Sequence, residues 1–317
     1  MKSYIAIVLL SFLLSIILNI IGIKFLKRLN AGQPILKYVE EHKVKQGTPT
    51  MGGLIFTVSS LICFFIFNKF TYNEGLVGAV IVFAYMCVGF LDDFVKIRYK
   101  QNEGLKPYQK IIFQSFIAFF ASLFVYFRIN TNLNIPFTKI SVDFGAWIIP
   151  ITILVFISVT NCVNLTDGLD SLAGGVSSVY LFFISLLILL QMENENHLIY
   201  LSLSFFGGLL GFLCFNVNKA SIFMGDTGSL ALGGLIASVS IFSENTLFIP
   251  FLGIMFVCSG ISVVLQVIYF KKTKKRIFLM APLHHHFQHK GYTESKISFV
   301  YSLITFLMGL SLIFVYL

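Results

Sequence analysis

Long apolar segments recur along the whole chain, and they restrict it to folds that a membrane can hold. Hydrophobic residues make up 57% of the 317 residues and charged residues only 12%, a composition far from that of soluble proteins. A helix needs ~20 mostly apolar residues to cross a bilayer. Ten runs approach that length, at residues 4–23, 52–68, 75–91, 111–127, 145–160, 172–190, 198–215, 229–243, 246–269 and 297–316.

Each of these runs is predicted to be a helix. Lipid offers no partners to backbone N–H and C=O groups, so only helices and closed barrels span it, and the alternating pattern of barrel strands is absent from the runs. We therefore predict an all-α, polytopic integral membrane protein with about ten transmembrane helices, which forms a single transmembrane domain over residues 1–317. Gly-Gly pairs at 52–53, 174–175, 207–208 and 233–234 are expected to let helices approach closely.

The basic residues indicate which connections face the cytoplasm. With ten spans, 19 of the 23 lysines and arginines fall in alternate connections, and cytoplasmic loops carry such an excess. Both termini are therefore expected to be extracytoplasmic, with cytoplasmic loops near residues 24–50, 92–110, 161–171, 216–229 and 270–296. The positive loops would attract anionic lipid headgroups and phosphate-bearing substrates, and we expect membrane lipid, not nucleic acid, as their partner.

Five of the six aspartates lie near ends of apolar runs that this topology places at the cytoplasmic face. Asp92 and Asp93 follow the run 75–91, and the other three are Asp167, Asp170 and Asp226. Acids beside lipid are costly, so a functional role is the first explanation for them. The sequence therefore predicts one shared polar site at the membrane surface.

The adjacent carboxylates of Asp92 and Asp93 suit two kinds of chemistry. Such a pair can bind Mg²⁺ through one or two oxygens while the metal reaches substrate phosphates, or one of them can act as a base. The alternative is a solvated helix end, but acids at a helix C-terminus oppose the macrodipole.

Residues 47–53, with the sequence GTPTMGG, lead into the second run. Backbone N–H groups at such a glycine-rich helix start suit a phosphate. The alternative is an ordinary start with threonine caps and proline in the first turn.

Residues 161–171 connect two runs and carry Asn161, Asn164, Asp167 and Asp170. This density of polar groups favours a binding role, since amide and carboxylate groups can hydrogen-bond the edge of a ring. Gly168 would permit close approach of the backbone. The alternative is a turn in which these side chains only cap the next helix.

Residues 216–229 hold Asp226 in a loop of small residues, with Phe223 three positions earlier. Asp226 is either a metal ligand or the N-cap of the next helix. Phe223 is expected to stack on a base or to anchor at the membrane interface.

Three consecutive histidines, His284, His285 and His286, follow a basic segment. Neither an HExxH spacing nor a cysteine partner supports zinc. Imidazoles among basic residues can donate hydrogen bonds to a diphosphate and change their charge near neutral pH.

Together these five motifs resemble the polyprenyl-phosphate N-acetylhexosamine-1-phosphate transferases, in order and over nearly the whole chain. Within that superfamily, residues 47–53 and the segment LHHHF at 283–287 are most similar to the phospho-N-acetylmuramoyl-pentapeptide transferases, the lipid I synthases. Relatives that transfer N-acetylglucosamine phosphate typically carry His-Ile-His in the last motif. The resemblance also agrees with ten spans and extracytoplasmic termini.

The resemblance implies a reaction in the bacterial cytoplasmic (inner) membrane, with the active site facing the cytoplasm. UDP-MurNAc-pentapeptide and undecaprenyl phosphate would give lipid I and UMP, with Mg²⁺ as the cofactor. The third residue of the peptide stem, the prenyl-binding groove and a homodimer are left open.

The resemblance also implies roles for individual residues. Asp226 would bind Mg²⁺, and Asp92 or Asp93 would deprotonate or orient the lipid phosphate for direct attack, with covalent attack by one of them as the alternative. His284, His285 and His286 would bind the diphosphate or the sugar side. The uridine and sugar region would comprise Asn164, Asp167, Gly168, Leu169, Asp170 and Phe223, and the supporting contacts Lys45, Thr50, Lys110 and Asn216.

Two other functions are weighed against this one. A sister enzyme would use UDP-GlcNAc on the same lipid. A secondary transporter or lipid flippase would place its acids near the middle of the membrane, whereas these aspartates lie at span ends.

Overall fold

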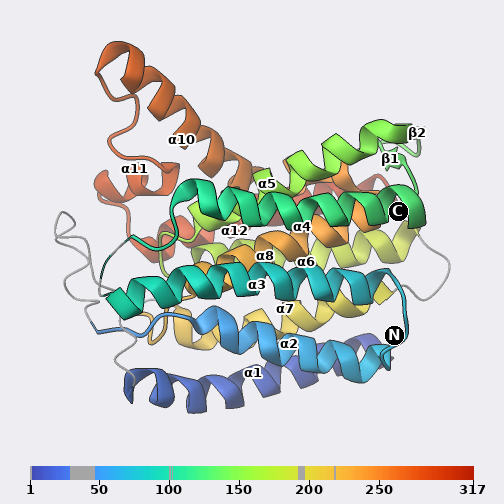
Figure 1. Cartoon of the computed structure of the whole chain (residues 1–317), viewed down its shortest axis with the longest axis horizontal. Helices are drawn as coiled ribbons and strands as arrows, with labels where there is room; N and C mark the ends of the chain where they lie inside the picture. Colours follow the sequence, from blue (N-terminus) through green and yellow to red (C-terminus); the bar gives the residue numbers. More distant parts are fainter. Residues whose placement is uncertain (1, 29–46, 100, 102, 192–196, 218) are drawn as a thin grey trace.

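The computed structural model describes residues 2–28, 47–99, 101, 103–191, 197–217 and 219–317. In this part of the chain, long helices run side by side in a bundle (Figure 1). Nine of them are long and apolar enough to cross a membrane, and α2 is a shorter apolar helix. The prediction of an all-α polytopic membrane protein is confirmed. The helices are α1 (Lys2–Arg28), α2 (Gly52–Asn68), α3 (Glu74–Tyr99), α4 (Pro107–Arg128), α5 (Ile148–Thr166), α6 (Leu172–Gln191), α7 (His197–Asn216), α8 (Gly225–Phe242), α9 (Ile249–Leu252), α10 (Ile254–Thr273), α11 (Leu283–His289) and α12 (Glu294–Phe314).

Helix α8 forms the centre of the bundle. All its residues from Thr227 to Phe242 are buried, and α2, α3, α5, α6 and α7 pack around it. Its sequence is rich in glycine, alanine and serine, and such residues let membrane helices come close enough for backbone contact. The central position follows from this small-residue surface.

The glycine pairs have the packing role that the sequence predicts. A Cβ at Gly53 in α2 would collide with the backbone of Gly228 in α8, and one at Gly233 would collide with Thr160 in α5. Gly208 in α7 lies against the side chain of Ser60. These contacts fix the spacing of the helices at values that larger residues would not permit.

Several helices continue beyond the apolar runs that predicted them. Helix α3 reaches Tyr99 and α5 reaches Thr166, while α8 already begins at Gly225. The expected loops near 92–110, 161–171 and 216–229 are therefore shorter than predicted, and Asp92, Asp93 and Asp226 lie within helices. The length of an apolar run reflects only the part of a helix that lies in the hydrocarbon layer. The helix can continue beyond it where polar side chains pair with one another.

The prediction of one continuous span at 246–269 is wrong. A short 3₁₀ turn and α9 come first, and α10 begins after Gly253. Pro250 lies in the first turn of α9, where its missing N–H is tolerated, so α9 is a new helix start. Helix α10 then leaves the bundle, and its far end stands apart from the other long helices (Figure 1).

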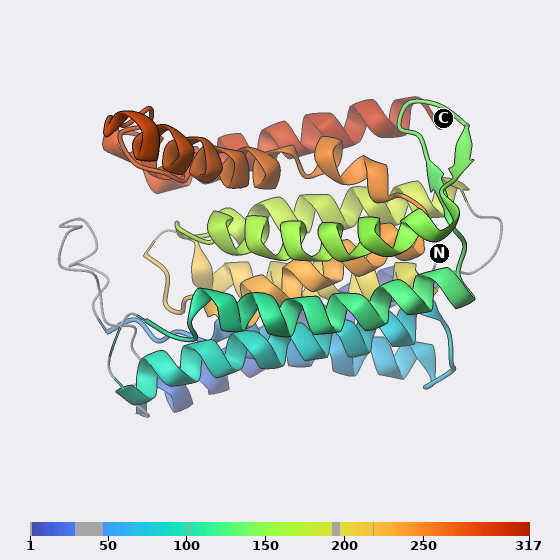
Figure 2. The same ribbon diagram turned by 45° about the horizontal axis from the view of Figure 1, so that its top comes forward.

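A small hairpin joins α4 and α5. Strands β1 (Asn132–Asn134) and β2 (Ser141–Asp143) pair antiparallel, with Leu133 opposite Val142. Both chain termini lie at this end of the bundle, and α11 lies at the opposite end (Figures 1 and 2). The opposite end also collects the C-termini of α3 and α5 and the N-termini of α4 and α8, so the motif-bearing segments meet there.

The close contact between α8 and α5 predicts that Gly233→Val destabilises the protein. The added side chain must enter the space of the Thr160 backbone, and overpacking of this kind typically costs ~1–3 kcal/mol. We expect the thermal unfolding midpoint in detergent to fall by about 5 °C. Ala6→Val enlarges an exposed residue of α1 and serves as the control; equal midpoints for the two variants would contradict this packing.

Candidate active site

The adjacent acids of α3 face different neighbours. Asp92 is 0% exposed and Asp93 is 2% exposed. Consecutive helix residues point about 100° apart, so the two carboxylates have different closest partners. Their contacts separate accordingly, with Asp92 facing α4 and Asp93 facing α8.

Asp92 is held by two ammonium groups and one backbone donor. The Nζ atom of Lys96, one turn later in α3, lies 2.7 Å from its Oδ2 atom, and Lys110 Nζ in α4 lies 2.9 Å from Oδ1. The N–H of Leu105 donates to the same Oδ1 at 2.7 Å. Gly104 passes so close that a Cβ there would collide with the carboxylate. The connection between α3 and α4 thus covers Asp92.

Asp93 bonds to the beginning of α8. Its Oδ1 accepts from the N–H of Asp226 at 3.2 Å, and its Oδ2 accepts from the N–H of Thr227 at 2.9 Å and from the Thr227 hydroxyl at 2.6 Å. Burial of a carboxylate is costly unless donors replace its water, and these three donors do so. The N-cap position of α8 is Met224, so the interpretation of Asp226 as the N-cap is wrong.

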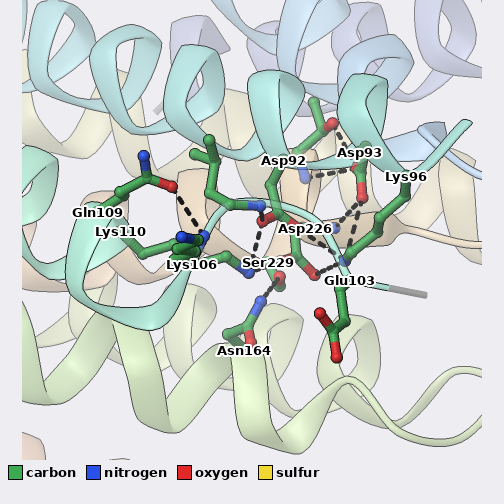
Figure 3. Close-up of polar contacts among 12 residues, drawn as sticks. Asp92, Asp93, Lys96, Glu103, Lys106, Gln109, Lys110, Asn164, Asp226 and Ser229 are labelled. Carbon is green, nitrogen blue, oxygen red and sulfur yellow. Dashed lines mark hydrogen bonds and ion pairs between the residues drawn. The ribbon is translucent and has the colours of Figure 1, made fainter. Parts of the chain in front are cut away.

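Asp226 in α8 completes the cluster. Its Oδ1 lies 3.3 Å from Lys96 Nζ and its Oδ2 lies 2.6 Å from Lys110 Nζ. The two lysines, from α3 and α4, approach the Asp226 carboxylate from opposite sides (Figure 3). Each lysine therefore bridges Asp92 and Asp226, and the four groups form a closed ring of alternating charges.

The cluster has the donor set of a site for a hard cation. One carboxylate oxygen from each of Asp92, Asp93 and Asp226 lies within 4.8 Å of the others, and oxygen ligands are those that Mg²⁺ prefers. Three carboxylates and two ammonium groups leave one net negative charge. The residues therefore fit a divalent cation, with Asp226 as the most exposed of the three acids at 16%.

Two further predicted residues adjoin this cluster. Asn164 in α5 donates from Nδ2 to the hydroxyl of Ser229 at 2.8 Å, one turn after Asp226 in α8. The buried Thr50 lies where a Cβ at Gly225 would touch both its hydroxyl and the Asp93 carboxylate. Segments that are far apart in the sequence therefore converge on the first turn of α8.

The expected phosphate-binding helix start is not available for that role. The N–H groups of Gly52 and Gly53 donate to the carbonyls of Phe223 and Met224 at 2.8 and 2.9 Å, and Phe223 N–H donates to the carbonyl of Pro49 at 2.8 Å. These bonds attach the start of α2 to the segment before α8. The phosphate interpretation of these two N–H groups is wrong, because the fold already uses them.

The turn between α5 and α6 is held by loop contacts. Asn216 accepts from Ser171 N–H at 2.9 Å and donates to the carbonyl of Ile222 at 2.9 Å. Asp170 accepts from Ala220 N–H at 3.1 Å, and the side chain of Leu169 is buried in the core. Two predicted substrate contacts, Asn216 and Asp170, thus connect this turn with the end of α7 and with Ala220.

The histidine segment forms α11 and lies against the same turn. A Cβ at Gly168 would touch the ring nitrogens of His284 and His285. Both ring nitrogens of His284 are buried and make no hydrogen bond within the described part of the chain. Burial, and then the neighbouring His285, lowers the pKa of His284 to about 3, so this imidazole is neutral at pH 7. His286 accepts from Leu279 N–H at 3.1 Å through its Nδ1 atom.

Asp167 follows the last residue of α5 and responds to the charges of the cluster. Burial first, and then the negative charges of Asp226 and Asp93, raises the pKa of Asp167 to about 8. A neutral carboxyl group can donate as well as accept a hydrogen bond. Asp167 can therefore act as a hydrogen-bond donor near neutral pH.

The structure unites most of the residues that the motifs singled out, with two qualifications. Lys45 lies outside the described residues. The sequence motifs do not single out Lys96, which bridges Asp92 and Asp226. Residues four apart lie on the same face of a helix, so the spacing of Lys96 from Asp92 predicts contact between them if both are helical. The apolar run ends at residue 91, and the sequence therefore does not predict a helix through these two positions.

Comparisons with known proteins give two family matches. Residues 75–244, more than half of the chain, match the model described as glycosyl transferase family 4. Residues 45–56 match the phospho-N-acetylmuramoyl-pentapeptide-transferase signature 1. The first match contains the acids of the cluster, and the second contains the start of α2 that contacts the segment before α8.

Curated relatives match almost the whole length of the chain. Phospho-N-acetylmuramoyl-pentapeptide-transferases of Caldanaerobacter subterraneus and Clostridioides difficile are 41% and 39% identical to it, over 94% and 95% of this chain and 93% and 94% of their own lengths. That of Clostridium perfringens is 42% identical over 94% of both chains. Identity at this level and coverage shows common membership, and the chain belongs to the phospho-N-acetylmuramoyl-pentapeptide-transferases within glycosyl transferase family 4.

Proposed function

We propose that the protein transfers phospho-MurNAc-pentapeptide from UDP-MurNAc-pentapeptide to undecaprenyl phosphate, which gives lipid I and UMP. The observation that carries this proposal is the buried ring of Asp92, Lys96, Lys110 and Asp226, in a chain that its named relatives match over almost its whole length. Charge stabilisation is the main task in phosphoryl transfer, and this ring supplies both signs of charge.

The location of the ring suits one soluble and one lipid substrate. It lies at an end of the bundle where four helix termini meet, near the level expected for a lipid phosphate. Basic residues at this end, such as Arg28 in α1, Arg98 in α3 and Lys272 in α10, support a cytoplasmic orientation with both chain termini outside. The bacterial relatives support an inner-membrane location. The single domain would then present its site to the soluble nucleotide sugar.

We assign the metal to Mg²⁺ and its main protein ligand to Asp226. Bound Mg²⁺ would offset the charge of the diphosphate and of the departing UMP. Asp226 is the most exposed acid of the cluster and has a lysine at each oxygen. Lys96 and Lys110 can exchange a carboxylate for a phosphate oxygen as substrates bind, because both side chains are flexible.

Asp92 is the acid assigned to the lipid phosphate. A phosphate oxygen of the lipid attacks the β-phosphorus of the nucleotide sugar, the bond to the bridging oxygen breaks, and UMP leaves. Asp92 accepts a proton from the lipid phosphate or orients it through the shared lysines. Both Asp92 oxygens lie within 3 Å of an ammonium nitrogen, which supports a role in orienting the lipid phosphate through the shared lysines.

The uridine and sugar contacts are assigned to the surrounding turns. Asn164, Asp167 and Gly168 lie beside α8 or α11, and Phe223 precedes α8 by two residues. The neutral His284 is assigned a hydrogen bond to the sugar or diphosphate. Its unpaired ring nitrogens support that role, since buried polar atoms normally have partners.

The alternatives are less well supported. A UDP-GlcNAc transferase of the same superfamily would share the acids, but the signature at residues 45–56 is that of the muramoyl-pentapeptide enzymes. A transporter would need acids near the middle of the membrane. Asp92 lies two turns from the end of α3 and Asp226 lies in the first turn of α8.

The proposal predicts Mg²⁺-dependent release of UMP from UDP-MurNAc-pentapeptide and undecaprenyl phosphate by the purified protein. Radiolabelled nucleotide sugars allow this substrate to be compared with UDP-GlcNAc under identical conditions. We expect turnover of the muramoyl compound and no lipid product from UDP-GlcNAc. Turnover of UDP-GlcNAc alone would refute the substrate assignment, and removal of Mg²⁺ by EDTA should stop the reaction.

Asp92→Asn and Asp226→Asn are each expected to lower kcat for UMP release by at least about 100-fold, because each removes charge that the reaction uses. Asp143→Asn changes an exposed acid in the hairpin at the other end of the bundle and is the matched control. If Asp226→Asn kept the activity of the control variant, the cluster would not be the catalytic site.

The neutral state of His284 predicts that His284→Asn leaves the shape of the pH–rate profile unchanged. Its pKa of about 3 places protonation well below pH 6, so the imidazole carries no charge over pH ~6–9. The rate should fall by about tenfold through a lost hydrogen bond. Disappearance of an acidic limb in this variant would show that His284 titrates during turnover.

A further inference from the structure

We infer that Asp93 is a positioning residue, which anchors the first turn of α8 and thereby places the Asp226 carboxylate. The inference rests on the proposed function and divides the roles of the two adjacent aspartates. Asp92 belongs to the charged ring, whereas Asp93 acts through α8. Asp93 is on this view neither the base nor a direct metal ligand.

Helix α8 lacks a capping side chain of its own. The first N–H groups of a helix have no partner within it, and a side chain at the N-cap usually supplies one. The N-cap residue of α8 is Met224, with helical backbone angles and no side-chain bond. Because α8 lies in the centre of the bundle, water cannot easily replace the missing cap.

Asp93 supplies the cap from another helix. It accepts from two consecutive N–H groups of α8 and from the Thr227 hydroxyl. The nearest ammonium nitrogen, that of Lys96, is 3.8 Å away, compared with 2.7 Å for Asp92. The charge of Asp93 is therefore compensated mainly by α8 donors and the positive end of the helix dipole.

Two glycines make this approach possible. A Cβ at Gly89, one turn before Asp93, would collide with the Asp226 carbonyl. Gly225 has φ +73°, a conformation that other residues rarely adopt, and a Cβ there would touch Asp93. The sequence thus keeps side chains away from the points where the carboxylate meets the helix start.

The anchored turn carries the functional carboxylate. Asp93 holds the N–H of Asp226, and the side chain of the same residue reaches Lys96 and Lys110. Loss of the anchor lets this turn shift, which moves the Asp226 oxygens away from the lysines and from a bound cation. A displacement of about 1 Å is enough to weaken such a site.

The test measures Mn²⁺ binding by electron paramagnetic resonance in the purified full-length protein, without substrates. Asp226→Asn should abolish binding, because it removes the ligand. Asp93→Asn and Thr227→Val should weaken Mn²⁺ affinity by about threefold to tenfold, the size expected for the loss of hydrogen bonds. Thr227→Ser retains the hydroxyl and should restore wild-type affinity.

A matched control separates the anchor from general effects of the substitution. Thr152→Val makes the same change at a buried threonine whose hydroxyl has no partner in the described part of the chain. Thr152 lies near the beginning of α5, far from the cluster. It should bind Mn²⁺ like the wild type. The thermal unfolding midpoint of each variant establishes that it is folded.

Three results would overturn the inference. Wild-type affinity in Thr227→Val would show that the contact with α8 does not place Asp226. Asp93→Asn that binds Mn²⁺ normally but releases no UMP would make Asp93 a catalytic base. Absence of Mn²⁺ binding in the wild type would remove the ligand role of Asp226. Normal Mn²⁺ binding without UMP release from any substrate would instead refute only the proposed function.

Discussion

Pairing of buried charge is the constraint on which this site depends. A carboxylate at the end of a membrane helix loses its water, and it stays charged only if ammonium groups or N–H donors replace that water. Asp92 and Asp226 obtain two lysines, and Asp93 obtains the start of α8. Removal of one partner would leave its counterpart unpaired, so the positions of these side chains are interdependent.

The positions of these charged side chains also depend on how the helices pack. Lysines on α3 and α4 can bridge to Asp226 only because α8 approaches α3 closely, and that approach requires glycine at position 89. Gly53 likewise lets α2 approach α8 closely. The N–H groups at the start of α2 then donate to the carbonyls of Phe223 and Met224, just before α8. The glycines at these contacts with α8 thus determine where the charged groups lie, as well as how tightly the helices pack.

Much of the fold follows from local properties of the sequence. The hydrophobic length of each run predicts a helix, because no other open structure satisfies its backbone in lipid. The same rule could not predict where α3 ends, since Lys96 pairs with Asp92 inside the helix, nor the break at Gly253. Those boundaries depend on contacts and turn geometry, which apolar length does not record.

The features of the candidate site also separate into those that the sequence predicts and those that depend on tertiary contacts. Residue types and their order by themselves determined the family resemblance and most members of the site, because acids and histidines beside apolar runs are costly without a function. Only the tertiary structure decided the separate positions of Asp92 and Asp93, the bridging role of Lys96 and the capture of the Gly52 and Gly53 N–H groups. The physical reason is that each of these properties depends on a partner more than 100 residues away or on a helix extending beyond its apolar run.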